Sequence, residues 1–350
     1  MRRLGIIMLA ALMFLPVALS AGGRTSAEGE VDVATMLFGH IGDSYGWHIT
    51  EWNGRHMTIP LPCIVRSSTG WKVFMSTEIE SGREYEGLFI AQEGRYKDKI
   101  VETGPDGQLV RPFDISITKN VCSLFFSGIL LVVIVLGCAR WYKRHDASES
   151  VPGGFTGLME MMIMMVQNDV IKDAAGKDYR KYSPYLLTVF FFIFLNNLLG
   201  IVPFFPGGAN LTGNIAVTLV LALCTFFAVN LFADRHYWKE ILWPDVPLFL
   251  KFPIPIMQVI EIFGMLTKPF SLMVRLFANI MAVHAMILGL VAVIFVTAKL
   301  GPVINGSMTV VTMLFGVFMD LLELLVAFIQ AYVFTMLSSV FIGLSRQAEE

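Results

Sequence analysis

The stretch MVRLFANIMAVHAMILGL, residues 273–290, has the apolar composition of a membrane-spanning helix, yet it contains Arg275 and His284. A charged side chain at the depth of a bilayer costs about 2.5 to 17 kcal/mol, depending on how well it reaches water or a partner. Such a residue therefore needs a partner, an aqueous path or a function. The rest of the chain has to indicate which of these applies.

The composition of the whole chain is that of a membrane protein. Of its 350 residues, 55% are hydrophobic and only 15% are charged, whereas a soluble protein has about 25% charged residues. The formal net charge of −2 provides no basic surface for nucleic acid. The four cysteines fit neither a disulfide framework nor a zinc site, so no metal or cofactor is expected.

The N-terminal third of the chain has the pattern of an exported segment. Residues 1–21 consist of Met-Arg-Arg, an apolar run and small residues, which is typical of a cleavable secretory signal; a retained first membrane helix is the alternative. Residues 22–118 are polar, with short alternating runs such as WKVFMS (71–76) between turn signals. This pattern predicts a small β-rich or partly ordered module on the exported side.

The first membrane span is predicted at residues 120–138, which form an uncharged run long enough to cross a bilayer. Arg140, Lys143 and Arg144 follow directly. Positive residues are enriched on the cytoplasmic side of membranes. This end of the span is therefore expected in the cytoplasm, which agrees with an exported N-terminus.

The middle of the chain predicts a surface helix and two further spans. Residues 155–182 are rich in methionine but interrupted by charges, as in an amphipathic helix that lies on the cytoplasmic surface. Residues 183–233 carry no charge and are divided by a Pro- and Gly-rich break at 203–214. We therefore expect two spans joined by an exported loop.

The last two apolar stretches, about 254–298 and 307–345, are too long for perpendicular spans. As helices they would measure about 65 and 57 Å, against about 30 Å of hydrocarbon. Either each breaks, for which only Pro269 offers a site, or both are tilted, which needs fewer assumptions. The predicted fold of residues 119–350 is an all-α polytopic membrane domain of five transmembrane helices and a surface helix, the last two helices long and tilted.

The polar residues of these two long helices form two stripes, because positions seven apart lie on nearly the same helix face. The first stripe contains Glu261, Lys268 and Arg275, with Asn279 on nearly the same side. His284 lies nine residues after Arg275 and faces about 180° away from it. The second stripe, on the last helix, contains Asp320, Glu323 and Gln330.

Two polar paths thus end near Arg275, one from Glu261 on the cytoplasmic side and one from Glu323 and His284 on the exported side. Acids and a histidine within a membrane are typical of proton relays. Neither path crosses the bilayer. In a simpler interpretation, Arg275 forms only a structural ion pair with Glu323 or Asp320.

The segment KPFSLMVRLFANIMAVHAMI (268–287) resembles the most characteristic helix of the subunit a family of F-type ATP synthases. The resemblance extends over about residues 120–345. It includes NDVIKDAAGKDYRKYSPYLLTVFFFIFLNNLLGIVPF (168–204), NIAVTLVLAL (214–223), EIFGMLTKP (261–269) and ELLVAFIQAYVFTML (323–337).

The resemblance implies roles for individual residues. Arg275 matches the stator arginine that faces the c-ring, and Gln330 matches its polar partner. Asn197 matches a channel asparagine, although Asn196 and Asn197 could instead only link helices, and Glu261 matches the acid near the cytoplasmic half-channel. His284 and Glu323 depart from the common bacterial pattern, because the acid and the imidazole have exchanged positions.

The resemblance further implies a non-catalytic subunit of the bacterial inner membrane that forms two offset proton half-channels. Its expected partners are the c-ring, the peripheral-stalk subunit b and the lipid bilayer, with the N-terminal module in the periplasm and the C-terminus in the cytoplasm. The chain has no phosphate-binding loop, so nucleotide chemistry would belong to other subunits.

The sequence also has to be compared with two other functional classes. A secondary transporter could bind an anionic substrate at Arg275, but it would be expected to contain inverted repeats, and the sequence has no visible repeat. A receptor that senses a ligand through residues 22–118 would leave the polar stripes around Arg275 unexplained.

Overall fold

The computed structural model describes residues 42–52, 55–104, 107–145, 151–176, 179–202, 207–209, 211–231, 233–242 and 256–346. The signal peptide predicted at residues 1–21 lies outside these ranges. The chain divides into two compact units. The first contains Met1–Phe126, Leu199–Ala209 and Ile287–Phe318, and the second contains Ser127–Leu198, Asn210–Met286 and Met319–Glu350.

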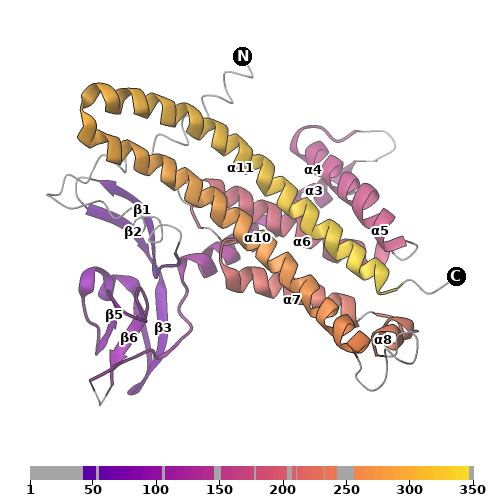
Figure 1. Cartoon of the computed structure of the whole chain (residues 1–350), viewed down its shortest axis with the longest axis horizontal. Helices are drawn as coiled ribbons and strands as arrows, with labels where there is room; N and C mark the ends of the chain where they lie inside the picture. The colour runs from indigo at the N-terminus through magenta and orange to yellow at the C-terminus, as the bar shows by residue number, and fades with distance from the viewer. Residues whose placement is uncertain are drawn as a thin grey trace. The chain divides into compact units, whose positions relative to one another are not determined.

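Strands occupy the region for which alternating runs predict them (Figure 1). They are β1 Gly46–Trp52, β2 Arg55–Pro60, β3 Pro62–Ser67, β4 Gly70–Met75, β5 Leu88–Ile90, β6 Ile100–Thr103, β7 Leu109–Val110 and β8 Phe113–Asp114. They form three antiparallel sheets, with the strand orders β1-β2, β4-β3-β8 and β5-β6-β7.

One face of the β4-β3-β8 sheet supplies the core of this region. Cys63 and Val65 on β3 are fully buried and pack with Phe74 on β4 and with residues of the β5-β6-β7 sheet. Tyr45 closes the cluster and donates a hydrogen bond of 2.5 Å to Asp114 Oδ2. Burial raises the pKa of the Cys63 thiol to about 11, so this thiol stays protonated and unreactive at neutral pH.

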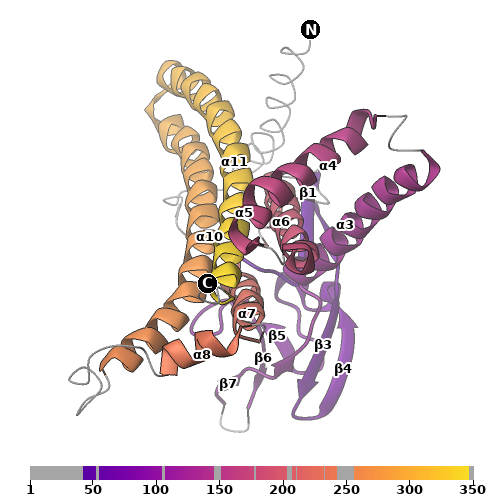
Figure 2. The same ribbon diagram turned by 90° about the vertical axis from the view of Figure 1, so that its right-hand side faces the viewer.

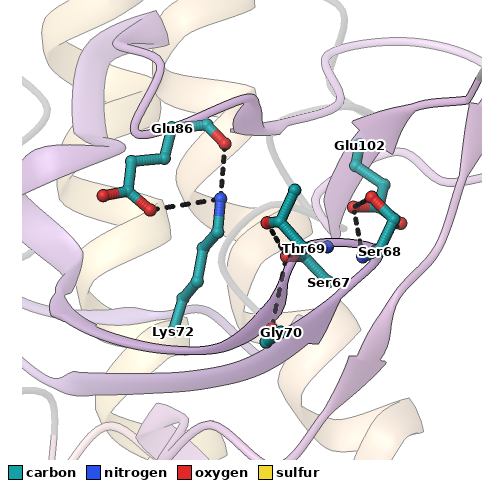
Figure 3. A network of polar contacts seen from close by, with 7 residues as sticks. All are labelled: Ser67, Ser68, Thr69, Gly70, Lys72, Glu86 and Glu102. Atoms are coloured by element: carbon teal, nitrogen blue, oxygen red, sulfur yellow. Dashed lines mark hydrogen bonds and ion pairs between the residues drawn. The ribbon is translucent and has the colours of Figure 1, made fainter.

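Polar contacts fasten the β3–β4 hairpin to its neighbours (Figure 3). Lys72 Nζ donates to the carbonyl oxygen of Glu86 at 2.7 Å and lies 3.2 Å from its carboxylate. At the hairpin turn, the Ser68 N–H lies 3.1 and 3.2 Å from the two carboxylate oxygens of Glu102 on β6. The hairpin is thereby held at both its turn and the middle of β4.

The described residues that follow β8 are mainly helical (Figure 1). The helices are α3 Lys119–Arg144, α4 Gly154–Met165, α5 Asp173–Ala175, α6 Tyr179–Ile201, α7 Ile215–Leu231, α8 Arg235–Leu242, α10 Ile256–Thr297 and α11 Pro302–Leu344. A π-helical segment, Val166–Lys172, continues α4 into α5. The helix predicted over 155–182 therefore ends earlier, because Gly176 adopts a φ of 63° and α6 begins at Tyr179.

Within the described residues, four helices are long and apolar enough to cross a membrane, namely α3, α6, α10 and α11. The chain is therefore a mostly helical, multi-pass membrane protein. The segment predicted as a further span contains α7, an apolar helix of 17 residues that is shorter than these four.

The two long helices, α10 and α11, contain 42 and 43 residues and neither is broken, although Pro269 lies inside α10. Figures 1 and 2 show them side by side and antiparallel. Of the two alternatives that the sequence left open for these stretches, breakage at Pro269 does not occur.

The core of the second unit lies between α6, α10 and α11. Its buried members include Leu186, Phe190 and Ile193 on α6, Leu272 and Leu276 on α10, and Phe334 and Ile342 on α11. The end of α11 approaches α5 so closely that a Cβ on Gly343 would lie 2.1 Å from the carbonyl oxygen of Ala174. Only glycine fits at this position without a backbone shift.

Candidate functional site

The site is organised by the two faces of α10 around Arg275. Leu272, Met273, Leu276 and Ile280 are buried and pack the helix onto the core. The exposed positions of the same segment are Val274, Arg275, Ala278, Asn279, Ala282, Ala285 and Met286. These exposed positions cover an arc of about 140° on the helix surface, and Arg275 lies inside this arc.

Arg275 is the one charged residue on this exposed face. No residue that the structure describes lies within hydrogen-bond or ion-pair distance of its guanidinium. The structural ion pair with Glu323 or Asp320, which the sequence left open, is therefore not found among those residues. The arginine lies on the outward face of an apolar helix, and no described residue neutralises it.

His284 and Glu323 lie in contact, although they come from different helices. His284 Nδ1 is 3.1 Å from Glu323 Oε1 and 3.2 Å from the carbonyl oxygen of Ile280. The side chain of Glu323 is 5% exposed and that of His284 is 20% exposed. Asp320, half-buried, precedes Glu323 by three residues and so lies one helical turn away. This end of the site can hold and exchange protons.

Asn197 connects three segments of the second unit. It is buried, and its Nδ2 donates to the carbonyl oxygen of Ala327 on α11 at 3.2 Å. Its Oδ1 accepts a hydrogen bond of 2.7 Å from Thr212 in the turn before α7. These contacts give Asn197 a helix-linking role in the described structure, as the simpler interpretation of the sequence expects.

The remaining predicted residues are placed on the same helices. Gln330 is buried on α11, two turns after Glu323, whereas Asn279 is exposed on the same face of α10 as Arg275. Glu261 is half-buried on α10. Among the described residues, no hydrogen bond or ion pair joins Gln330, Asn279 or Glu261 to Arg275.

The sequence did not predict a line of hydroxyl groups between α6, α7 and α11. Tyr185 and Thr225 hydroxyl oxygens are 3.3 Å apart, and Thr225 lies 3.4 Å from Ser338. Thr335 and Ser339 have buried hydroxyls without a partner among the described residues. Spaced Ser and Thr residues in α11 were a possible signal, but such residues are also common where membrane helices pack.

A small cleft, with room for about one water molecule, lies beside this line of hydroxyl groups. It is lined by Thr225 and Asn230 of α7, by Lys268 of α10 and by Phe341 of α11. Lys268 Nζ lies 5.5 Å from the centre of the Phe341 ring, and Asn230 has a buried Oδ1 without a partner among the described residues. The cleft therefore offers polar atoms within an apolar helix bundle.

Comparison with known proteins adds independent information. The model of the ATP synthase A chain family matches residues 124–343, and that of a domain of unknown function matches residues 36–118. The chain is 42% identical over 237 residues to ATP synthase subunit a 2 of Chlorobaculum tepidum, across 67% of this chain and 65% of that protein.

In two further relatives, the matched region is a larger share of the relative's own length. ATP synthase subunit a 2 of Prosthecochloris aestuarii is 41% identical over 282 residues, which are 77% of this chain and 82% of that protein. ATP synthase subunit a of Myxococcus xanthus is 39% identical over 239 residues, which are 66% of this chain and 73% of that protein. Because the matched family model covers most of the helical part and well over half of the residues, the chain belongs to the ATP synthase A chain family.

Proposed function

We propose that Arg275 of this chain couples the passage of protons to the rotation of a partner c-ring. The chain is the proton-translocating stator subunit a of an ATP synthase. The observation that carries this proposal is the outward position of Arg275 on α10 without a partner among the described residues. Placing an arginine against lipid near the bilayer centre would cost about several kcal/mol of free energy. A partner with carboxylates would remove that cost.

The side chains around Arg275 suit a helical partner. Ala278, Ala282 and Ala285 share its exposed face, and small residues let membrane helices approach closely. A ring of helices that each carry one carboxyl group could therefore pass directly in front of the guanidinium.

The electrostatics of this arrangement favour a coupled mechanism. A guanidinium stays charged at any physiological pH, and it stabilises the ionised form of a nearby carboxylate. A rotor carboxyl group must release its proton as it approaches Arg275 and take up another as it leaves. Arg275 thus orders the proton transfers and blocks direct leakage, but it does not itself carry a proton.

The two proposed half-channels lie on opposite sides of Arg275 along α10. His284, with Glu323 and Asp320, belongs to the exported side, and Glu261 belongs to the cytoplasmic side. At 1.5 Å per residue, Arg275 is about 14 Å from His284 and about 21 Å from Glu261 along the helix axis. Protons could cross this separation only by being carried on the ring. Gln330, Asn279, Asn197 and the cleft beside Lys268 would then provide polar surface along the two routes.

A cysteine cross-linking experiment tests the proposed rotor contact. Ala278 lies one turn from Arg275 on the exposed face, so an Ala278→Cys variant is expected to form a disulfide with a cysteine placed beside the rotor carboxyl group. Val132→Cys on α3 is the matched control, because this position is equally apolar and 57% exposed. Cross-linking of the control, but not of Ala278→Cys, would contradict the proposed face.

We further propose that five helices span the membrane, namely α3, α6, α7, α10 and α11. The 17 residues of α7 measure about 26 Å, which is near the lower limit for a span, whereas α10 and α11 must be tilted. Arg140, Lys143 and Arg144 at the end of α3 support a cytoplasmic location for that end. Residues 22–118 then form a periplasmic module after a signal at 1–21, and α8 and the C-terminus are cytoplasmic.

Labelling of single cysteines tests this topology. Glu93→Cys and Lys239→Cys both place a thiol at an exposed position. In intact spheroplasts, a membrane-impermeant maleimide is expected to label Glu93→Cys only, and Lys239→Cys should react after the membrane is broken. Native Cys63 should contribute little background, because it is buried and the pKa of its thiol is raised to about 11. Labelling of Lys239→Cys alone would reverse the proposed orientation.

A further inference from the structure

The β4-β3-β8 sheet has one face whose side chains are mostly apolar and exposed among the described residues. In an antiparallel sheet, residues directly opposite each other on neighbouring strands share a face. Arg66 lies opposite both Trp71 and Phe113, and the register then continues along the strands. The face consists of Ile64, Arg66, Trp71, Val73, Met75, Phe113 and Ile115, and we call it the apolar sheet face.

The exposure of this face is unusual for a module outside the membrane. Trp71 is 56%, Val73 is 67% and Phe113 is 63% exposed, whereas the solvent-facing side of an antiparallel sheet is normally polar. These side chains do not belong to the core, which is formed by Val65, Phe74 and other residues on the opposite side of the sheet. A contiguous apolar patch of this kind marks an interaction surface.

The chemistry of the apolar sheet face matches a lipid surface. Arg66 is its only charged residue, and the guanidinium lies 5.9 Å from the centre of the Trp71 ring. Trp71 also makes an edge-to-face contact with Phe113, at 6.4 Å between ring centres. Aromatic rings are enriched at the level of lipid headgroups, and arginine binds phosphate oxygens with two parallel hydrogen bonds. Lys72 points to the opposite face, where Glu86 neutralises it.

The sheet also lies close to the first residues of α3, a helix that is long and apolar enough to cross a membrane. Beyond β8, the Ile115 N–H donates to the Ile64 carbonyl oxygen at 2.9 Å, and the Ile117 N–H donates to that of Pro62 at 3.1 Å. Only Thr118 then separates this pairing from α3, which begins at Lys119. The Lys119 N–H in turn donates to the Ser44 carbonyl oxygen at 2.9 Å. At about 3.4 Å per residue, Phe113 can lie no more than about 20 Å from the start of the span.

We propose that the apolar sheet face lies on the lipid surface beside the N-terminal end of α3. Trp71, Val73 and Phe113 enter the boundary between headgroups and acyl chains, and Arg66 binds lipid phosphate. The module is then a peripheral membrane anchor as well as an exported domain. This inference is independent of the role of Arg275, because it concerns other residues and predicts no change in proton coupling.

Tryptophan quenching by lipid tests the proposal on the full chain. The protein is reconstituted into vesicles of phosphatidylethanolamine and phosphatidylglycerol with brominated acyl chains. The fluorescence of Trp71 is obtained as the difference in tryptophan fluorescence between the unmodified chain and Trp71→Phe. Brominated lipids occupy both leaflets, so the orientation of the protein in the vesicle does not matter. Trp47→Phe gives the matched control, since Trp47 belongs to the same region but is only 3% exposed.

We expect brominated lipid to quench the Trp71 signal at least about twofold more strongly than the Trp47 signal. An Arg66→Glu variant should weaken that difference, because a carboxylate is repelled by lipid phosphate. Quenching of Trp71 by aqueous acrylamide but not by brominated lipid would overturn the proposal. Protection of Trp71 from both quenchers only in the assembled ATP synthase would also overturn it, because a neighbouring subunit would then cover the face.

Discussion

Replacement of Arg275 by alanine is expected to abolish ATP synthesis driven by a proton gradient and to reduce ATP-driven proton pumping at least about 100-fold. In the proposed mechanism, the outward guanidinium is the fixed positive charge that favours ionised rotor carboxylates at one place. Without it, the carboxyl groups have no reason to release their protons there, and the electrostatic barrier between the two half-channels is lost. We therefore also expect a passive proton leak through membranes that carry the variant.

The experiment uses inverted membrane vesicles, in which the quenching of a pH-sensitive dye measures ATP-driven acidification. Arg275→Lys should not restore coupling, because a lysine can lose its charge when it is desolvated, whereas an arginine cannot. Met286→Leu is the matched control, since Met286 lies on the same exposed face but carries no charge. Normal pumping by Arg275→Ala would refute the proposed mechanism.

The second large effect is expected at His284 and Glu323. Alanine at either position should slow proton entry from the exported side by about tenfold or more, because a positioned acid or base contributes about 10²–10⁴-fold to proton transfer. Loss of His284 also leaves the carboxyl group of Glu323, which is 5% exposed, without its imidazole partner. The double exchange, His284→Glu with Glu323→His, keeps one acid and one imidazole in contact and should recover much of the rate.

The rate of proton uptake after a pH jump measures each of these variants, and the double-mutant cycle separates coupling from independent effects. The two residues interact directly, with 3.1 Å between Nδ1 and Oε1, so the losses should not be additive. If the exchanged variant is as slow as the product of the two single losses predicts, His284 and Glu323 do not work as a pair.

Much of the helical part could be predicted from the sequence, because long uncharged apolar runs are rare in proteins that do not cross a membrane. Helical periodicity also placed Arg275 and His284 on opposite sides of α10, and the structure has Arg275 exposed and His284 partly buried. The sequence also favoured unbroken helices in the last two apolar stretches, although a proline inside a helix costs about 3 kcal/mol. The structure agrees, because α10 continues through Pro269.

Other features depend on contacts between residues far apart in the sequence. Asn197 is bound by Thr212, 15 residues later, and binds the backbone of Ala327, 130 residues later. No local pattern reports such partners. In the WKVFMS run, both faces of the strand carry apolar residues, so periodicity alone could not tell that Phe74 is buried while Trp71 and Val73 are exposed.

The unbroken length of α10 has a mechanical consequence. A helix of 42 residues is a rod of about 63 Å, and Arg275 lies near its middle, where a turning rotor would push on it. No hinge interrupts the rod at Pro269, so the sideways load cannot be relieved by local bending. The buried face of α10, on the other side of the helix from Arg275, packs on the core through Leu272, Met273, Leu276 and Ile280. In the proposed mechanism, α10 would therefore be supported directly behind the point where the rotor acts on it, as a subunit that must stay still against torque requires.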